Sequence, residues 1–127
     1  MNENEISFAI RGAIFKAYNN IGPGLLESAY EAALGYELKK EGLLVSTQVG
    51  LPFVYESIGL DMGYRIDIMV ENKVIIEVKS VEQLTEVHYK QLLTYLQLSD
   101  KRLGILVNFN TDKIDQSIKR IVNHLVE

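Results

Sequence analysis

The chain has 127 residues, 47% hydrophobic and 24% charged, a composition typical of one soluble globular domain over residues 1–127. The absence of cysteine excludes disulfides, thiolate nucleophiles and cysteine-built zinc sites, and two histidines are too few for a histidine-built metal centre. A formal net charge of −4 argues against tight, indiscriminate nucleic-acid binding, which depends on neutralised phosphates. We expect a cytoplasmic protein without membrane association, because the N-terminal residues lack a signal-peptide core and no run of about 18 apolar residues occurs.

Two helices are predicted first. Apolar residues recur at helical spacing from Ile6 to Ile21, which indicates an amphipathic helix of about four turns. The Gly-Pro-Gly of residues 22–24 ends this helix, and a second helix is expected from Leu25 to Lys40. Glu27 lies in the first turn of the second helix, where it either complements the helix dipole or reaches into a site.

Extended segments follow. Val45 to Tyr55 is predicted to be extended. Because proline removes a ladder donor, this strand is an edge strand, or it is bulged or broken at Pro52. Residues 57–63 are expected to form a loose turn, with the next strand starting as early as Gly59. Two further strands are predicted over residues 64–70 and 74–79, joined by a short turn.

The last two strands carry charge in otherwise apolar runs. Since side chains alternate along a strand, Asp67 shares a face with Arg65, and Glu77 shares a face with Lys79. A three-residue connection places Asp67 opposite Glu77, whereas a two-residue loop places them on opposite faces. Neighbouring carboxylates repel each other unless a cation or a proton intervenes, so the first register predicts half of a divalent-metal site. The alternatives are a solvated strand face and an ordinary Arg65–Asp67 salt bridge.

A third helix is expected to end near Leu98. Ser80 to Gln83 has the form of a capping box, so the helix begins there or a few residues later. His88, Gln91 and Tyr95 follow at spacings that put them on one helix face, which meets either a site or water.

The C-terminal part is predicted as a strand followed by a helix. Leu103 to Phe109 is nearly continuously apolar, which is typical of a strand buried on both faces, and Thr111 or Asp112 can cap a last helix. The strand–helix–strand unit from residues 74 to 109 should be right-handed with parallel strands, so the sheet is mixed. The last segment also carries basic residues that could hold nucleic-acid phosphates: Lys113, Lys119 and Arg120.

This order of elements, with Asp67 followed by the E-x-K of Glu77 and Lys79, resembles the PD-(D/E)XK nuclease superfamily. Gly24 to Tyr30 is similar to the G-x-x-E-x-x-Y signature of a family of small bacterial and archaeal proteins within it. The remaining similar stretches are residues 64–67, 77–79, 88–96, 104–110 and 118–122. The resemblance implies an α/β fold with a restriction-endonuclease-like core in the order αβββαβ. It further implies a mixed four-stranded sheet flanked by helices, with extra N- and C-terminal helices.

The resemblance also implies a Mg²⁺-dependent nuclease, with Mn²⁺ as an alternative metal and DNA as the expected substrate. Asp67 and Glu77 would bind the metal, and Lys79 would position or polarise an attacking water. The other implied site residues are Glu27, Gln91 and Tyr95. Two carboxylates and a substrate phosphate are an adequate ligand set for Mg²⁺, which keeps several waters.

A second interpretation is a catalytically inactive module that keeps the fold and binds nucleic acid or a protein partner. The complete set of acids with Lys79 favours the enzyme, since a binding role has no evident need for them. The acidic pI and the lack of a dedicated DNA-reading segment favour the module. A homodimer is compatible with both interpretations.

Overall fold

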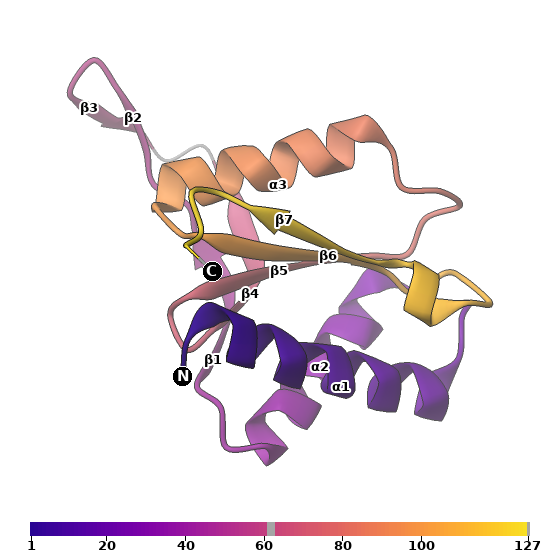
Figure 1. Ribbon diagram of the computed structural model, residues 1–127. Coiled ribbons are helices and arrows are strands. Elements are labelled where there is room, and N and C mark those ends of the chain that lie inside the picture. Colours follow the sequence, from indigo (N-terminus) through magenta and orange to yellow (C-terminus); the bar gives the residue numbers. More distant parts are fainter. Residues whose placement is uncertain (61–62, 127) are drawn as a thin grey trace.

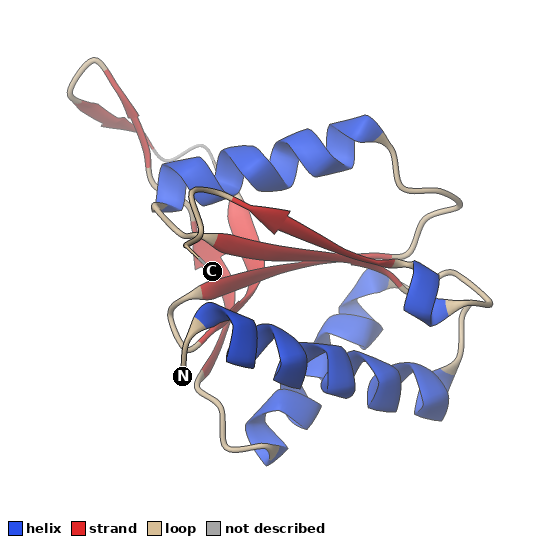
Figure 2. Cartoon of the chain, in the orientation of Figure 1, coloured by secondary structure: helices blue, strands red, loops and turns tan. Residues whose placement is uncertain are grey.

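The computed structural model describes residues 1–60 and 63–126. A five-stranded sheet lies between two layers of helices (Figures 1 and 2). Helices α1 (Glu3–Ile21) and α2 (Glu27–Lys40) cover one face of the sheet, and α3 (Glu86–Ser99) covers the other. No helix in the described part of the chain is long and apolar enough to cross a membrane.

The sheet has the strand order β1-β4-β5-β6-β7. Its strands are β1 (Val45–Gly50), β4 (Arg65–Val70), β5 (Val74–Lys79), β6 (Leu103–Asn108) and β7 (Ile118–Val122). β1, β4 and β5 form an antiparallel meander, α3 leads to the parallel strand β6, and β7 pairs antiparallel with β6. The predicted restriction-endonuclease-like core is confirmed, since α2, β1, β4, β5, α3 and β6 follow in the order αβββαβ.

Each sheet face packs against its own helices. Tyr30 of α2 stacks on Phe109 after β6, with ring centroids 4.4 Å apart and planes 6° from parallel. On the opposite face, Met69 and Ile75 pack with Leu92 of α3. The buried stripe of α1 matches the predicted helical spacing and consists of Ile6, Ile10, Ala13, Ile14 and Ala17.

The predicted C-terminal helix is wrong, and the sheet gains a fifth strand instead. The chain makes only a short 3₁₀ turn, η1 (Ile114–Gln116), before β7. Ile118, Ile121 and Val122 have the i, i+3, i+4 spacing of a helix, but β-branched side chains also suit a strand. β7 forms hydrogen bonds with the main-chain N–H and C=O groups along the edge of β6 that would otherwise be unpaired. This pairing favours a strand over a helix.

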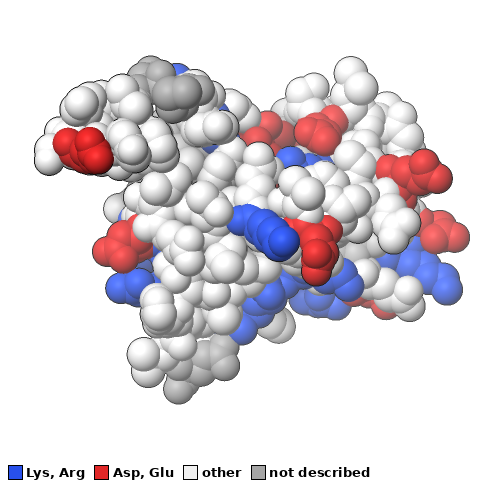
Figure 3. Space-filling model, turned by 90° about the horizontal axis from the view of Figure 1, so that it is seen from above, with Lys and Arg blue, Asp and Glu red and all other residues white. Residues whose placement is uncertain are grey.

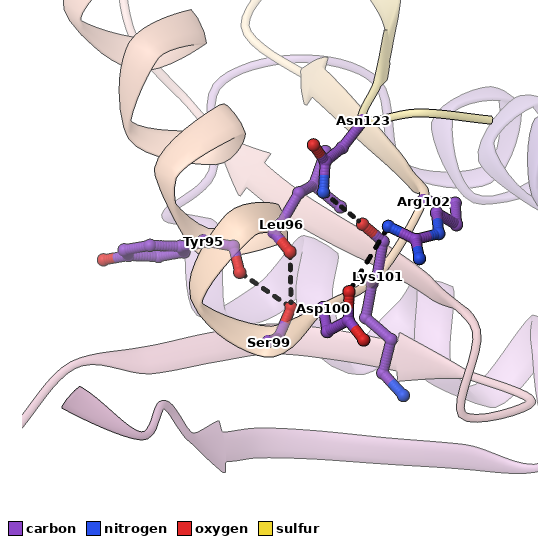
Figure 4. A network of polar contacts seen from close by, with 7 residues as sticks. All are labelled: Tyr95, Leu96, Ser99, Asp100, Lys101, Arg102 and Asn123. Atoms are coloured by element: carbon purple, nitrogen blue, oxygen red, sulfur yellow. Dashed lines mark hydrogen bonds and ion pairs between the residues drawn. The ribbon is translucent and has the colours of Figure 1, made fainter. Parts of the chain in front are cut away.

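Asn123 fixes the end of β7 to the turn between α3 and β6 (Figure 4). Its main-chain N–H donates to the Arg102 carbonyl at 2.9 Å, and its side-chain amide donates to the Lys101 carbonyl at 3.0 Å. Arg102 also forms an ion pair with Asp100 at 3.3 Å. This buried asparagine therefore holds the C-terminal end of β7 against the start of β6.

The break predicted at Pro52 is confirmed and leads into a separate hairpin. β2 (Phe53–Tyr55) and β3 (Ile58–Leu60) pair only with each other and project from the main body (Figure 1). The sequence predicted a loose turn over residues 57–63, with a strand starting as early as Gly59, but not this separate hairpin. Residues 56 and 57 both have positive φ, 48° and 73°, which is the conformation that a two-residue hairpin turn requires.

The start of α3 lies later than the Ser80 pattern alone suggests. Thr85 is the N-cap, and its main-chain N–H donates to Nδ1 of His88 at 3.0 Å. His88 therefore closes the first turn of the helix. Ser80 instead donates its hydroxyl proton to the Leu25 carbonyl at 2.7 Å, which ties the end of β5 to the start of α2.

Candidate active site

The turn between β4 and β5 sets the register on which the site depends. Val70 pairs with Val74 across residues 71–73, and the Lys73 N–H donates to the Val70 carbonyl at 3.0 Å. Glu71 and Asn72 adopt positive φ values of 54° and 53° in this turn. The three-residue connection is the one that places Asp67 and Glu77 on the same face, as the alternation predicts.

Asp67 and Glu77 lie side by side where β4 and β5 cease to pair. The last residue pair is Ile68 with Ile76. Beyond it, the Asp67 N–H donates to Oε2 of Glu77 at 2.9 Å, and the Val78 N–H donates to Oδ2 of Asp67 at 2.8 Å. Each carboxylate therefore accepts a main-chain proton from the opposite strand, and the two side chains are held in fixed positions.

The surroundings of the pair disfavour the ionised form of both carboxylates. Glu77 is only 4% exposed, and burial raises the pKa of Glu77 to about 8, with the charge of Asp67 adding to this effect. Burial also raises the pKa of Asp67, against the Val78 N–H and the Lys79 ammonium, which lower it. A cation bound beside the pair would favour the ionised form of both groups.

Glu27 and Lys79 flank this pair. Glu27 is the first residue of α2, and its Oε1 accepts a hydrogen bond from the Ser80 N–H at 3.3 Å. Its charge contributes to the raised pKa of Asp67, so the two carboxylates are close. Lys79 is half-buried at the end of β5, and its charge lowers the pKa of both Asp67 and Glu77. The structure thus brings four of the predicted site residues together.

Gln91 and Tyr95 approach the same place from α3. The Gln91 side-chain amide donates to the Tyr95 hydroxyl at 3.2 Å. Burial raises the pKa of Tyr95, and the charges of Glu77 and Asp67 raise it further. The phenol is therefore close to both carboxylates, and Gln91 joins the site through it.

Two residues that the sequence did not single out extend the site. Gln48 occupies the position on β1 opposite Asp67, outside the regular ladder and with a φ of 51°. Its amide donates to both carboxylate oxygens of Glu31, at 2.9 and 3.1 Å, and is close enough to Asp67 to lower the pKa of that group. Glu31 lies one helix turn after Glu27, a spacing that could have identified it. Burial raises the pKa of Glu31, and the charges of Asp67 and Glu27 add to this.

The predicted phosphate-binding residues are not brought together on one face. Lys113 precedes η1 and is exposed, while Lys119 and Arg120 are consecutive on β7 and so point to opposite faces. Arg120 donates to the side chain of Asn4 on α1. On the face seen in Figure 3, which looks down on α3, acidic and basic side chains are interspersed among neutral ones.

The comparison with protein families explains this arrangement. The model of the PD-(D/E)XK nuclease superfamily matches residues 4–121. The chain belongs to the PD-(D/E)XK nuclease superfamily. Membership indicates a nuclease and therefore nucleic-acid binding, and nucleases of this superfamily generally use divalent metals. No curated protein and no solved structure matches the chain.

The side chains of this PD-(D/E)XK protein fit a metal that needs few protein ligands. In residues 1–60 and 63–126, no group of three or more His, Asp or Glu side chains is arranged to hold a metal ion. Mg²⁺ binds with one or two carboxylates plus substrate phosphates and keeps several waters. The adjacent carboxylates of Asp67 and Glu77 have the chemistry of such a ligand set.

Proposed function

We propose that the protein is a Mg²⁺-dependent phosphodiesterase that hydrolyses nucleic acid, with DNA as the expected substrate and Mn²⁺ as an alternative metal. The observation that carries this proposal is the pair formed by half-buried Asp67 and buried Glu77 at the point where β4 and β5 separate, with Lys79 beside it. The stretch from Gly24 to Tyr30 supports assignment to the smaller family that carries the G-x-x-E-x-x-Y signature.

Asp67 and Glu77 would hold the ion. When bound, a divalent ion neutralises charge that develops during in-line attack at the phosphate and lowers the pKa of a coordinated water. The hydrogen bonds from the Asp67 and Val78 N–H groups fix the two carboxylates before any ligand arrives. Because the carboxylates are already in place, little rearrangement of these protein groups is needed when the phosphate reacts.

Lys79 would act on the phosphate and the water. Its ammonium lies near both carboxylates, so it can stabilise the charge on a phosphate held at the same point. Gln48 would keep Glu31 and Asp67 in fixed positions, because its amide lies between them. Glu27 would hold the end of β5 through the Ser80 N–H.

A cleavage assay tests the proposal. Wild-type protein is incubated with Mg²⁺ or Mn²⁺ and with single-stranded, duplex and branched DNA and the corresponding RNA. Cleavage is expected with at least one substrate. It should fall by orders of magnitude in Glu77→Gln, and by about 10²–10³-fold in Lys79→Ala, the usual cost of losing one preorganised charge-stabilising group.

The matched control is Glu41→Gln, a carboxylate on the surface that pairs with Lys16 at 2.9 Å. This variant should cleave like the wild type. The proposal fails if the wild type cleaves no substrate with either metal, and if Glu77→Gln binds nucleic acid or a protein partner as tightly as the wild type does. That result would instead support the non-catalytic module.

A further inference from the structure

An aromatic recess opens beside the carboxylates on the α3 side of the sheet. Its volume is about 270 Å³, and its lining residues are Phe53, Tyr64, Gln91, Thr94, Tyr95 and Leu98. Phe53 is the first residue of the projecting hairpin, and Tyr64 directly precedes β4. The recess is therefore built where the hairpin, the start of β4 and α3 meet.

Two tyrosines give the recess its aromatic character. The ring centroids of Tyr64 and Tyr95 are 6.3 Å apart, and the ring planes are tilted by 52° rather than stacked. Tyr64 is 46% exposed, whereas Tyr95 is 7% exposed, so one ring is accessible and the other is fixed by packing. Phe53 adds a third ring at the edge of the same space.

We propose that this recess binds one unstacked nucleobase of the substrate strand, next to the phosphate that is cleaved. The proposal rests on the proposed function for the position of that phosphate. Aromatic rings stack with any base, because every base has a π-face. The Gln91 amide supplies both a donor and an acceptor, which can pair with the polar edge of a base.

Tyr95 links the recess to the two carboxylates. Its ring lines the recess and packs in one apolar cluster with Met69 and Ile75, which lie two residues from Asp67 and Glu77 on the same strands. The charges of Glu77 and Asp67 also raise the pKa of Tyr95. A nucleotide whose phosphate lies at the two carboxylates can thus place its base in the recess. No other ligand class available to a nuclease combines a flat aromatic surface, a polar edge and an attached phosphate.

The recess predicts a preference among substrates. Removing a base from an intact duplex requires unpairing and unstacking, and this cost is smallest for a base that is already unpaired. Single strands, overhangs and mismatched positions should therefore bind better than a fully paired duplex.

Abasic scanning tests this inference. A single-stranded oligonucleotide is prepared with one base removed at each position in turn, and its binding is measured by fluorescence anisotropy in EDTA, so that hydrolysis does not intervene. Loss of the base that enters the recess should weaken wild-type binding by about 5- to 150-fold, the usual range for one base stacked on an aromatic side chain. Phe53→Leu and Tyr64→Leu remove a ring but keep an apolar side chain.

In these two variants the loss of affinity at the abasic position should be smaller than in the wild type, because one of the rings that contact the missing base is gone. The matched controls are Phe8→Leu and Tyr55→Leu, which replace rings that are 83% and 60% exposed and do not line the recess. Both controls should respond to the abasic position like the wild type, and thermal unfolding confirms that all four variants are folded.

The inference is overturned if no abasic position weakens wild-type binding, if the wild type does not bind the oligonucleotide, or if the recess variants respond like the controls. Cleavage by the wild type together with any of these results leaves the nuclease proposal standing without the recess. Abasic sensitivity that depends on Phe53 or Tyr64, in a protein that cleaves nothing, supports the recess and removes the nuclease proposal.

Discussion

Replacing Glu77 with Gln should stabilise the metal-free protein, and the gain should grow with pH. Glu77 is 4% exposed and adjoins a second carboxylate, so its ionised form is disfavoured in the folded state. The Glu77→Gln side chain keeps the size and retains an oxygen that can accept the Asp67 N–H. It removes only the charge.

The magnitude follows from the difference in pKa between the two states. Glu77 titrates at about 8 in the folded protein, against an ordinary value of 4.5. The folded state therefore holds a proton between these values that the unfolded state has lost, and stability falls as pH rises through this window. Between pH 5 and pH 8 the wild type should lose about 3 kcal/mol through this group, at about 1.4 kcal/mol per unit of pKa difference.

Urea unfolding in EDTA at pH 5, 6, 7 and 8 measures this effect as the difference between wild type and Glu77→Gln. Glu41→Gln is the control, because the hydrogen bond from Lys16 lowers the pKa of Glu41 below its ordinary 4.5. This shift is opposite in direction to that of Glu77, so the contribution of Glu41 to stability should not fall as pH rises through this window. If the difference in unfolding free energy between Glu77→Gln and the wild type does not increase from pH 5 to pH 8, the raised pKa of Glu77 is refuted.

Three further predictions concern other parts of the structure. Gly104→Ala should cost about 1–3 kcal/mol in urea unfolding, because its Cβ would lie 2.9 Å from Cδ1 of Leu92, and an unchanged midpoint would contradict this packing. Gln48→Gly should be more stable than Gln48→Ala by roughly 1 kcal/mol, since the residue has a φ of 51°, and equal stabilities would argue against that conformation. Lys119→Ala should reduce the salt dependence of DNA binding by about one ion, whereas Arg120→Ala, on the opposite face of β7, should leave it unchanged. An equal reduction in both variants, or none in Lys119→Ala, would contradict this.

The central part of the fold could be predicted because its determinants are local. Alternation along β4 and β5 places Asp67 and Glu77, and the length of one turn fixes their register. The stops at Gly22 and Pro52 follow from the backbone preferences of single residues.

The remaining features depend on contacts between distant segments. Ile118 to Val122 fits a helix by spacing, and only the unpaired edge of β6 makes it a strand. Gln48 meets Asp67 through the register between β1 and β4, which nothing in the sequence near either residue indicates. Phe53 and Tyr64 approach α3 only in the folded chain, so the aromatic recess cannot be found from residue spacing.

The Asp67–Glu77 pair can be tested as a metal site without knowing the substrate. Calorimetric titration with Mn²⁺ should show one ion bound to the wild type and to Glu41→Gln. Glu77→Gln should weaken binding by at least about tenfold, since even changes in residues that only support a metal ligand cost 10–100-fold. Wild-type protein that binds no Mn²⁺, or Glu77→Gln that binds it as tightly as the wild type, would contradict a metal-dependent nuclease centred on these two carboxylates.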